Sequence, residues 1–355
     1  MVALDPPSLA GYWSQVVALV ERELPEFTVE PGGTQGFENE RLTLGHGVIG
    51  RWPGLDPGAA QHLPRVARIA GQGFVIGLEL CHQCDVGELE ARAIADVCAL
   101  ANVMISGFDH VVDGPPVGAA ELTSAMSRDR IVEALDLHRE GRYPVFSRSP
   151  FGDPAAAYVA AVGEAFFAQC RRLGTRKADD RKWARLASTV LEAYDAELIA
   201  ANPGDRPIEC LREAFRLKSA HSCSILGGVV DLSSATGLTR AEGCLIEAME
   251  PLGEVAGMVD DLCDLGLDVR GGQLSSLLLL IDDEKFLRND SGRDLAGAFE
   301  ALARDKVLER AIGTMAASIR ALSRNSREIL RDPDRFMQHV RLWLGTWLSA
   351  GPIEA

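Results

Sequence analysis

Aspartates with helical spacing are the residues of this chain best suited to do chemistry. Asp260, Asp264 and Asp268 follow one another at intervals of four residues, and Asp261 stands beside the first. Positions four apart on a helix are offset by only about 40°, so the three share one face if a helix extends to residue 268. The residues between them are mainly apolar, as in a core, where a carboxylate is costly unless its charge is compensated.

A second acidic pair, Asp109 and Asp113, ends an apolar stretch that predicts a helix over 94–112. The Gly-Pro-Pro of 114–116 should stop this helix. A helix C-terminus already carries partial negative charge, so these carboxylates do not serve as caps. Oxygen ligands with no paired His or Cys favour Mg²⁺ or Mn²⁺. Either pair alone could be a solvated helix end, but two pairs about 150 residues apart favour a metal site.

Cations that could bind an anion beside such metals lie upstream of the second cluster. Arg212, Arg216 and Lys218 fall within one predicted helix. Arginine binds phosphate through two parallel hydrogen bonds, and lysine binds it as a point charge. Arg270, just after the second cluster, could join the same site. A basic surface stripe is the alternative interpretation of these residues.

Helical patterns dominate the chain. Apolar residues recur at three- and four-residue spacing, and alternating strand-like runs are scarce, which predicts an all-α bundle. The predicted helices cover residues 86–112, 154–174, 180–201, 207–234, 240–266 and 293–323. Residues 1–70 predict an N-terminal helix (about 8–24) and a long glycine-rich loop. Residues 71–355 form the main helical domain, and no linker divides the two parts.

Composition excludes several functions. The net charge of −15 argues against nucleic-acid binding over a broad basic surface. The chain shows no apolar run of membrane-spanning length and no signal-peptide start, so we expect no integral membrane segment. Its eight scattered cysteines suit reduced, buried thiols and a cytoplasmic location. Cys81 and Cys84 form a CxxC pair with no second ligand pair, which favours packed thiols over a metal or redox site.

The stretch "LGEVAGMVDDLCDLGLD" resembles the second aspartate-rich motif of the trans-isoprenyl diphosphate synthases and the related class I terpene synthases. Asp260, Asp261 and Asp264 fall on its DDxxD positions, with Asp268 as a further acidic residue. Lys218 falls where that family has a Lys-Thr motif, and residues 109–113 correspond to its first motif. The resemblance covers about residues 85–285. It implies a single helical bundle with a central active-site cavity.

This chain departs from the chain-extending members of that family. We find no Gly-Lys-x-x-Arg-Pro segment near the N-terminus and no Arg-Arg-Gly after the first motif, which together hold the acceptor and allylic diphosphates. Gly257 replaces a glutamine, and His110 replaces an aspartate; the role of His110 stays open. Metal clusters without an acceptor site are the pattern of a terpene cyclase. The spacing of Asp260, Asp264 and Asp268 also matches the second metal motif of class I cyclases, and Arg212 and Arg216 bracket the position of their diphosphate-sensing arginine.

The resemblance therefore implies Mg²⁺, usually three ions, with Mn²⁺ possible, bound by the six aspartates at 109, 113, 260, 261, 264 and 268. Catalytic roles fall to Asp109, Asp260, Arg212 and Arg216, and Lys218, Arg270 and Phe108 also contact the substrate. Expected cavity walls are Met104, Ile105 and Phe108, with Trp343 and Trp347, although all five could be ordinary core. A homodimer is also expected.

The prediction is a Mg²⁺-dependent cyclase that ionises a linear C15–C20 prenyl diphosphate, with C20 favoured, and releases diphosphate. Two alternatives stay open. One is a prenyltransferase with an unusual acceptor, and the other is a non-catalytic partner subunit. Retention of four aspartates in the second cluster argues against the subunit, because an inactive site need not keep buried charge.

Overall fold

The structure is a computed structural model that describes residues 9–27, 33–52, 55–63, 65–136, 146, 150–174, 180–233, 245–288 and 294–351. This part of the chain is helical and contains no β-strand, which confirms the predicted all-α class. The longer helices are α1 (Leu9–Glu23), α2 (Gly33–Ile49), α3 (Val66–Gln83), α4 (Glu88–Val112), α5 (Pro116–Ala125), α6 (Arg128–Asp136), α7 (Pro154–Gly174), α8 (Asp180–Ala201), α9 (Ile208–Ser233), α10 (Leu245–Gly271), α12 (Leu295–Arg304), α13 (Val307–Ile329) and α14 (Pro333–Ala350). Short helical turns are η1 (Pro25–Phe27), η2 (Ala59–His62), η3 (Leu278–Leu280) and α11 (Glu284–Leu287).

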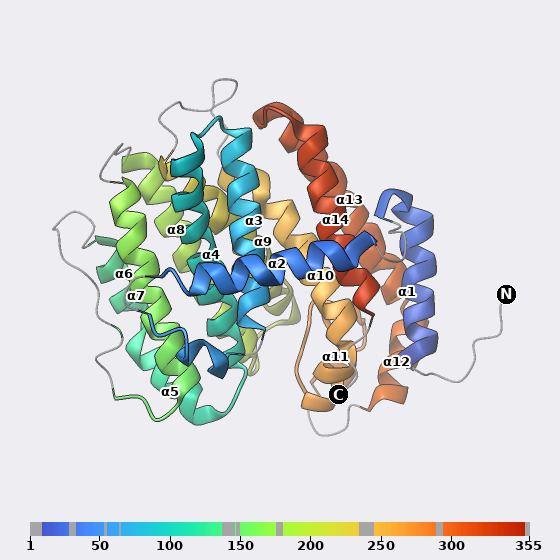
Figure 1. Ribbon diagram of the computed structural model, residues 1–355. Coiled ribbons are helices and arrows are strands. Elements are labelled where there is room, and N and C mark those ends of the chain that lie inside the picture. Colours follow the sequence, from blue (N-terminus) through green and yellow to red (C-terminus); the bar gives the residue numbers. More distant parts are fainter. Residues whose placement is uncertain are drawn as a thin grey trace.

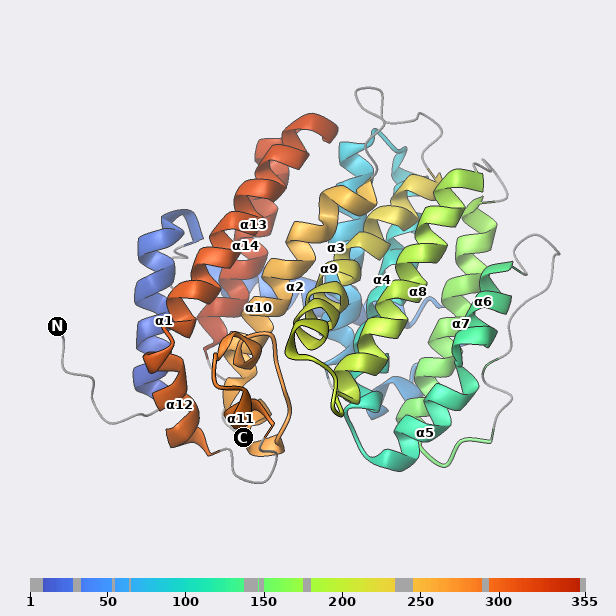
Figure 2. The same ribbon diagram turned by 180° about the vertical axis from the view of Figure 1, so that it is seen from behind.

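A set of long helices forms the centre of the bundle. α4 packs against α3 and α7, and α9 packs against α8 and α10. α1, α12, α13 and α14 lie on one side of this centre and α5 and α6 on the other (Figures 1 and 2). The acidic ends of α4 and α10 are thus carried on two helices that are themselves packed into the core.

The N-terminal region differs from the predicted long loop. The predicted first helix is present as α1, and Tyr12 on it donates a hydrogen bond to the carbonyl of Leu262 in α10 (3.0 Å). Residues 33–49, however, form α2, which runs across α3 (Figure 1). Gly45 was read as a loop signal, but a Cβ on it would overlap the backbone of Ala67 in α3. This glycine allows α2 and α3 to pack closely and does not form a turn.

Two further boundaries refine the sequence expectations. The sequence predicts a division after residue 70 between an N-terminal part and the main helical domain. This point lies inside α3, and the division stays a prediction. The single helix expected over 293–323 is broken into α12 and α13. Lys306 between them adopts a left-handed backbone conformation (φ 50°), which ends one helix and starts the next.

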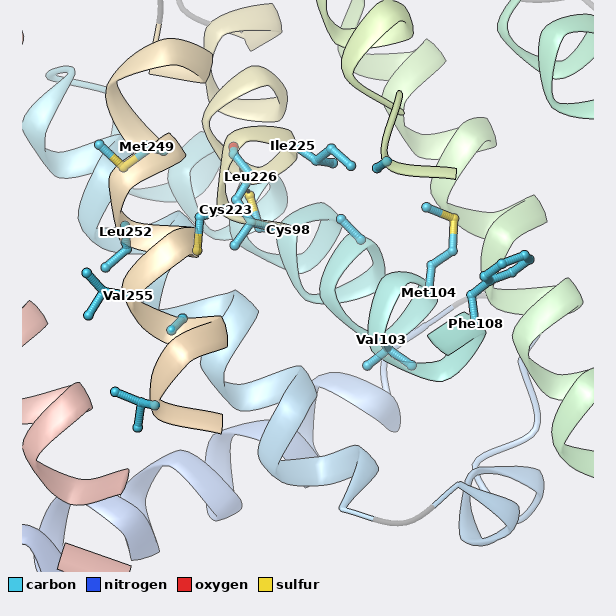
Figure 3. Close-up of a cluster of buried hydrophobic side chains, with 14 of the residues drawn as sticks. Cys98, Val103, Met104, Phe108, Cys223, Ile225, Leu226, Met249, Leu252 and Val255 are labelled. Carbon is cyan, nitrogen blue, oxygen red and sulfur yellow. Dashed lines mark hydrogen bonds between the residues drawn. The ribbon is translucent and has the colours of Figure 1, made fainter. Parts of the chain in front are cut away.

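α4 is long and apolar enough to cross a membrane, but 72% of its most apolar window is buried inside the bundle. Its composition is therefore explained by its central place in the core. Figure 3 shows part of this core, where Met104 and Phe108 of α4 lie side by side, with Ile225 and Leu226 of α9 nearby. Residues of α4 just before Asp109 thus help to form the apolar interior.

Candidate active site

The two acidic segments occupy the ends of α4 and α10. Asp109 lies in the last turn of α4, and Asp113 follows it as the C-terminal cap. α10 continues to Gly271, so Asp268 lies on the same helix as Asp260, as its spacing predicted. The Gln273 side chain, just beyond α10, donates a hydrogen bond to the carbonyl of Asp113 (3.4 Å). The ends of the two helices are therefore neighbours.

Lys218 of α9 is the cation at the first acidic pair. Its ammonium donates a short hydrogen bond to Asp109 and lies 3.8 Å from Asp113 Oδ2. Burial by itself raises the pKa of Asp109, but the Lys218 charge lowers it below its ordinary value. Burial and the charge of Asp109 instead raise the pKa of Asp113 to about 6. The lysine thus keeps Asp109 ionised.

Glu197 of α8 is a member of this cluster that sequence reasoning missed. Its side chain is 7% exposed, and its Oε2 lies 3.1 Å from Lys218 Nζ. The carboxyl group is also within hydrogen-bonding reach of Asp109. Burial raises its pKa well above the ordinary value, although the lysine opposes this. A single glutamate in a helix gives no motif signal, and only its apolar flanks could have drawn attention to it.

Close packing of α9 on α10 sets the position of Lys218. Gly257 of α10 faces Ser219, the residue after the lysine. A Cβ on Gly257 would come within 2.6 Å of the Ser219 Cβ, closer than such carbons ever approach. The absence of a side chain at 257 therefore lets α9 bring Lys218 close to α10 one turn before Asp260 and Asp261.

The aspartates of α10 carry unusually high pKa values. Burial, with the charges of Asp264 and Asp261, raises the pKa of Asp260 to about 8. Burial and the same two neighbours raise that of Asp268 to about 8. Burial raises the pKa of Asp261 to about 6. A 2.7 Å hydrogen bond from the Ser276 backbone N–H lowers this pKa and so opposes the effect of burial. Such a cluster holds more negative charge than its surroundings compensate, as a cation site does.

The two acidic segments also influence each other. The charge of Asp109 raises the pKa of Asp260, and the Lys218 ammonium lowers that of Asp261. The charges of the two segments are therefore close enough to affect each other's ionisation.

Arg65, at the start of α3, is a second residue that sequence reasoning missed. It is exposed, its charge lowers the pKa values of Asp260 and Asp264, and its backbone has φ 54°. A non-glycine residue in this region is uncommon and is often held there by function. Arg65 and Arg68 have the three-residue spacing of the Lys and Arg in Gly-Lys-x-x-Arg-Pro. An arginine in place of the motif lysine hides this pair in the sequence.

The donor set fits a hard divalent cation. The Oδ1 atom of Asp264 is buried and has no hydrogen-bond partner. Within the described ranges, no three His, Cys, Asp or Glu side chains converge closely enough to hold an ion by themselves. Mg²⁺, however, keeps several waters and takes one or two carboxylates together with substrate phosphate oxygens, so a complete protein cage is not required.

The structure does not bring the predicted arginines to the aspartates. Arg216 pairs with Glu213 and Glu254 (2.8 and 3.0 Å), and Arg212 donates to the carbonyl of Leu279 (2.8 Å). Positions 216 and 218 are about 200° apart around a helix, so the two side chains leave opposite sides of α9. Arg270 is exposed at the end of α10. Of the predicted cations, Lys218 is the one at the carboxylates.

An apolar pocket begins at this cluster. Its wall includes Phe108, whose ring centroid is 5.4 Å from that of Tyr194, together with Met104 and Ile105. Glu197 belongs to the same wall. The complete lining is Met104, Ile105, Phe108, Met126, Ile131, Phe167, Val190, Ala193, Tyr194, Glu197 and Ile225. Its lining is mainly apolar, as in many small-molecule sites.

Other predicted residues lie elsewhere. Trp343 lines a different pocket, with Phe336 and Leu252, and its ring is 5.9 Å from that of Trp347. Neither tryptophan is among the residues that line the pocket of Phe108. His110 is exposed, and the structure leaves its role open.

The CxxC thiols of Cys81 and Cys84 are free and buried, and burial raises their pKa values, to about 12 for Cys84. Among the described residues no metal-ligand group includes them. This is the pattern of inert packed thiols.

No protein-family model matches the chain, and no curated protein matches it. Solved structures do. A geranylgeranyl pyrophosphate synthetase from the archaeon Geoglobus acetivorans is similar over 90% of this chain and 99% of its own, with 14% identity and a TM-score of 0.51. A second geranylgeranyl pyrophosphate synthase covers 95% and 98%, with 11% identity and a TM-score of 0.50. The chain has the fold of the trans-isoprenyl diphosphate synthases. At this identity the likeness establishes the fold, which the resemblance of the two acidic segments predicted.

Proposed function

We propose that this protein ionises an allylic prenyl diphosphate with the help of divalent metal ions and transfers the prenyl group to an acceptor. One observation carries the proposal: the Lys218 ammonium is paired with Asp109 and Glu197, and Glu197 also lines an apolar pocket. Cations beside an apolar cavity suit a substrate with an anionic head and a hydrocarbon tail.

The chain's own residues divide the work. Asp109, Asp113 and the α10 aspartates would hold Mg²⁺ or Mn²⁺, which when bound neutralises charge that develops on the diphosphate. Lys218 binds a diphosphate oxygen as a fixed cation. When the carbon–oxygen bond breaks, both electrons go to the diphosphate, and the lysine stabilises the charge that this creates. Arg212, Arg216 and Arg270 stay predictions as substrate ligands.

The pocket protects the allylic cation. Phe108 and Tyr194 present aromatic rings, whose electron-rich faces attract cations. Met104, Ile105 and Ile225 complete walls that exclude water, so the cation reacts with its intended partner instead of forming an alcohol. The substrate chain length stays a prediction, C15–C20 with C20 favoured.

Two observations support transfer over cyclisation. The solved structures with this fold are named as geranylgeranyl pyrophosphate synthases. Arg65 adds a cation beside Asp260 and Asp264, where an acceptor diphosphate could bind, and Arg68 keeps the spacing of the acceptor motif. The absence of an acceptor site was the main argument for a cyclase, and this pair weakens it.

Cyclisation is the second candidate, because one part of the acceptor motif is missing. Residues 114–125, which follow the first acidic pair, contain no Lys or Arg. In the extending synthases an arginine pair stands there. A prenyl cation without an acceptor would close on its own double bonds and lose a proton, which gives a cyclic hydrocarbon and free diphosphate.

Product analysis separates these functions. The purified protein is incubated with Mg²⁺ and C10, C15 or C20 allylic diphosphate, with and without isopentenyl diphosphate. A longer prenyl diphosphate that forms only with isopentenyl diphosphate supports transfer, and Arg65→Met should then raise the KM for isopentenyl diphosphate about tenfold. A hydrocarbon or terpene alcohol from one substrate alone supports cyclisation instead. No product and no diphosphate release in any mixture would favour the non-catalytic partner subunit.

A further inference from the structure

A buried acceptor on α8 shares the ammonium of Lys218 with the first acidic pair. The Oε2 atom of Glu197 is 3.1 Å from Nζ, and Asp109 accepts a shorter hydrogen bond from the same nitrogen. The ring centroid of Phe215 lies 5.8 Å from Nζ on α9 itself. Carboxyl groups on α4 and α8 and one aromatic ring thus surround the ammonium.

The two carboxyl groups differ in what they can do when substrate binds. Asp109 lies at the acidic end of α4 and would turn to a metal ion, which competes with the ammonium for the same oxygens. Glu197 is 7% exposed, while Asp109 is 35% exposed, so Glu197 is set deeper, beside the apolar pocket. It can therefore keep its hydrogen bond to Lys218 after Asp109 has changed partner.

We propose that Glu197 is a positioning residue that holds Lys218 at the diphosphate site while Asp109 and Asp113 bind metal. An ammonium has three N–H donors. One donor stays with Glu197, and the others, released from the aspartates, become available to diphosphate oxygens. This inference rests on the proposed function and adds to it a residue outside both acidic motifs.

The position of Glu197 matters because Lys218 has a flexible four-carbon chain. Without Glu197, the best remaining partner of the Lys218 ammonium is Asp109. The ammonium would then compete with the metal for Asp109 instead of binding the substrate. The hydrogen bond carries this role rather than a net charge. Glutamine, which also offers an oxygen acceptor of the same reach, should therefore replace glutamate, whereas an apolar side chain of the same length should not.

The test measures binding of inorganic diphosphate in the presence of Mg²⁺ by calorimetry, and binding of Mn²⁺ alone by electron paramagnetic resonance. Glu197→Met should weaken diphosphate binding about tenfold or more, the effect of losing one charge-assisted hydrogen bond, and should weaken Mn²⁺ binding because Lys218 stays on Asp109. Glu197→Gln should stay within about threefold of wild type. Glu192→Met on the same helix is the matched control, because this half-exposed carboxylate pairs with His221 (3.2 Å) and not with Lys218, and it should change neither measurement.

Three results would overturn the inference. The first is equal binding of diphosphate by the Met and Gln variants. Both lack the carboxylate and only Gln keeps an oxygen acceptor, so equal binding would mean that Glu197 acts through its charge and not through the hydrogen bond. It does not act through Lys218 if Glu197→Met weakens diphosphate binding equally in a Lys218→Met background. Third, should Glu197→Met fail to fold, wild-type diphosphate binding by Glu197→Asp would overturn the inference, because the shorter side chain should draw the ammonium back and cause an intermediate loss. If wild type itself binds no diphosphate with Mg²⁺, the proposed function fails rather than the role of Glu197.

Discussion

Each of the four aspartates of α10 carries a charge that its surroundings disfavour. Asp260 and Asp268 both have a pKa of about 8, set first by burial and then by neighbouring aspartates. Their values in an unfolded chain are about 4. These residues are costly in the metal-free protein, and the proposed divalent cation would remove that cost on binding. Under the proposed function, the site therefore serves its ligand rather than the stability of the empty fold.

The pH dependence of stability follows from these values. Because the folded state binds more protons than the unfolded state between about pH 4 and pH 8, the free energy of unfolding should fall as pH rises through that window. Thermal unfolding with EDTA should therefore show a melting temperature several degrees lower at pH 8.5 than at pH 6. Mg²⁺ should raise it most at the higher pH, and Asp268→Asn should reduce the EDTA difference. A melting temperature in EDTA that rises with pH would contradict this account.

Residue spacing predicted the aspartates but not their partners. Intervals of four residues placed Asp260, Asp264 and Asp268 on one helix face, because a helix repeats regularly whatever surrounds it. Glu197 and Arg65 could not be found this way, since each reaches the site from a separate helix by tertiary packing. Arg212 and Arg216 were selected by charge and proximity in sequence, but the helical rotation from Lys218 directs them elsewhere.

At the scale of elements, the crossing of α9 and α10 fixes the geometry of the site. Gly257→Ala should push Ser219 away, because the new Cβ would overlap it. We expect a loss of about 1–3 kcal/mol in the free energy of unfolding and weaker diphosphate binding. Gly313→Ala on α13 is the control, because a Cβ there meets no atom within 4 Å, and it should stabilise the protein by about 0.5–1 kcal/mol. Equal effects of both substitutions would show that the α9–α10 contact is unimportant.

The end of α4 should control the depth of the pocket. Phe108→Ala removes a buried ring and should cost about 3–5 kcal/mol of stability. It should also let the pocket accept a longer prenyl chain, because the ring forms part of the pocket wall together with Tyr194. Competition among C10, C15 and C20 substrates, analysed by mass spectrometry, measures this. An unchanged order of preference would mean that Phe108 is ordinary core.

Helix periodicity predicted most elements, because apolar spacing reflects which side is buried. Glycines were the exception. Gly45 and Gly257 were read from their residue type as a loop signal and a motif departure, yet both allow helices to approach closely. A glycine that permits close packing and one that permits a turn look alike in a sequence, and only the neighbouring helix distinguishes them.

At the scale of the whole molecule, α1 and α2 complete the bundle around the central helices. Among the described residues the large apolar side chains with high exposure are Val17, Leu89 and Val117. A homodimer and a cytoplasmic location stay predictions. Sedimentation at several protein concentrations would measure the oligomeric state. The fold itself follows from the sequence, but the choice between the proposed transfer and cyclisation depends on residues that meet only in three dimensions.

The central claim is that the acidic ends of α4 and α10 act with Lys218 to ionise an allylic diphosphate. The most direct test is the rate of diphosphate release from C15 and C20 allylic diphosphates with Mg²⁺, with EDTA, and with the Asp260→Asn protein. We predict release that requires the metal and falls by about a thousandfold or more in Asp260→Asn. Release at an undiminished rate in EDTA or in the variant would contradict the account.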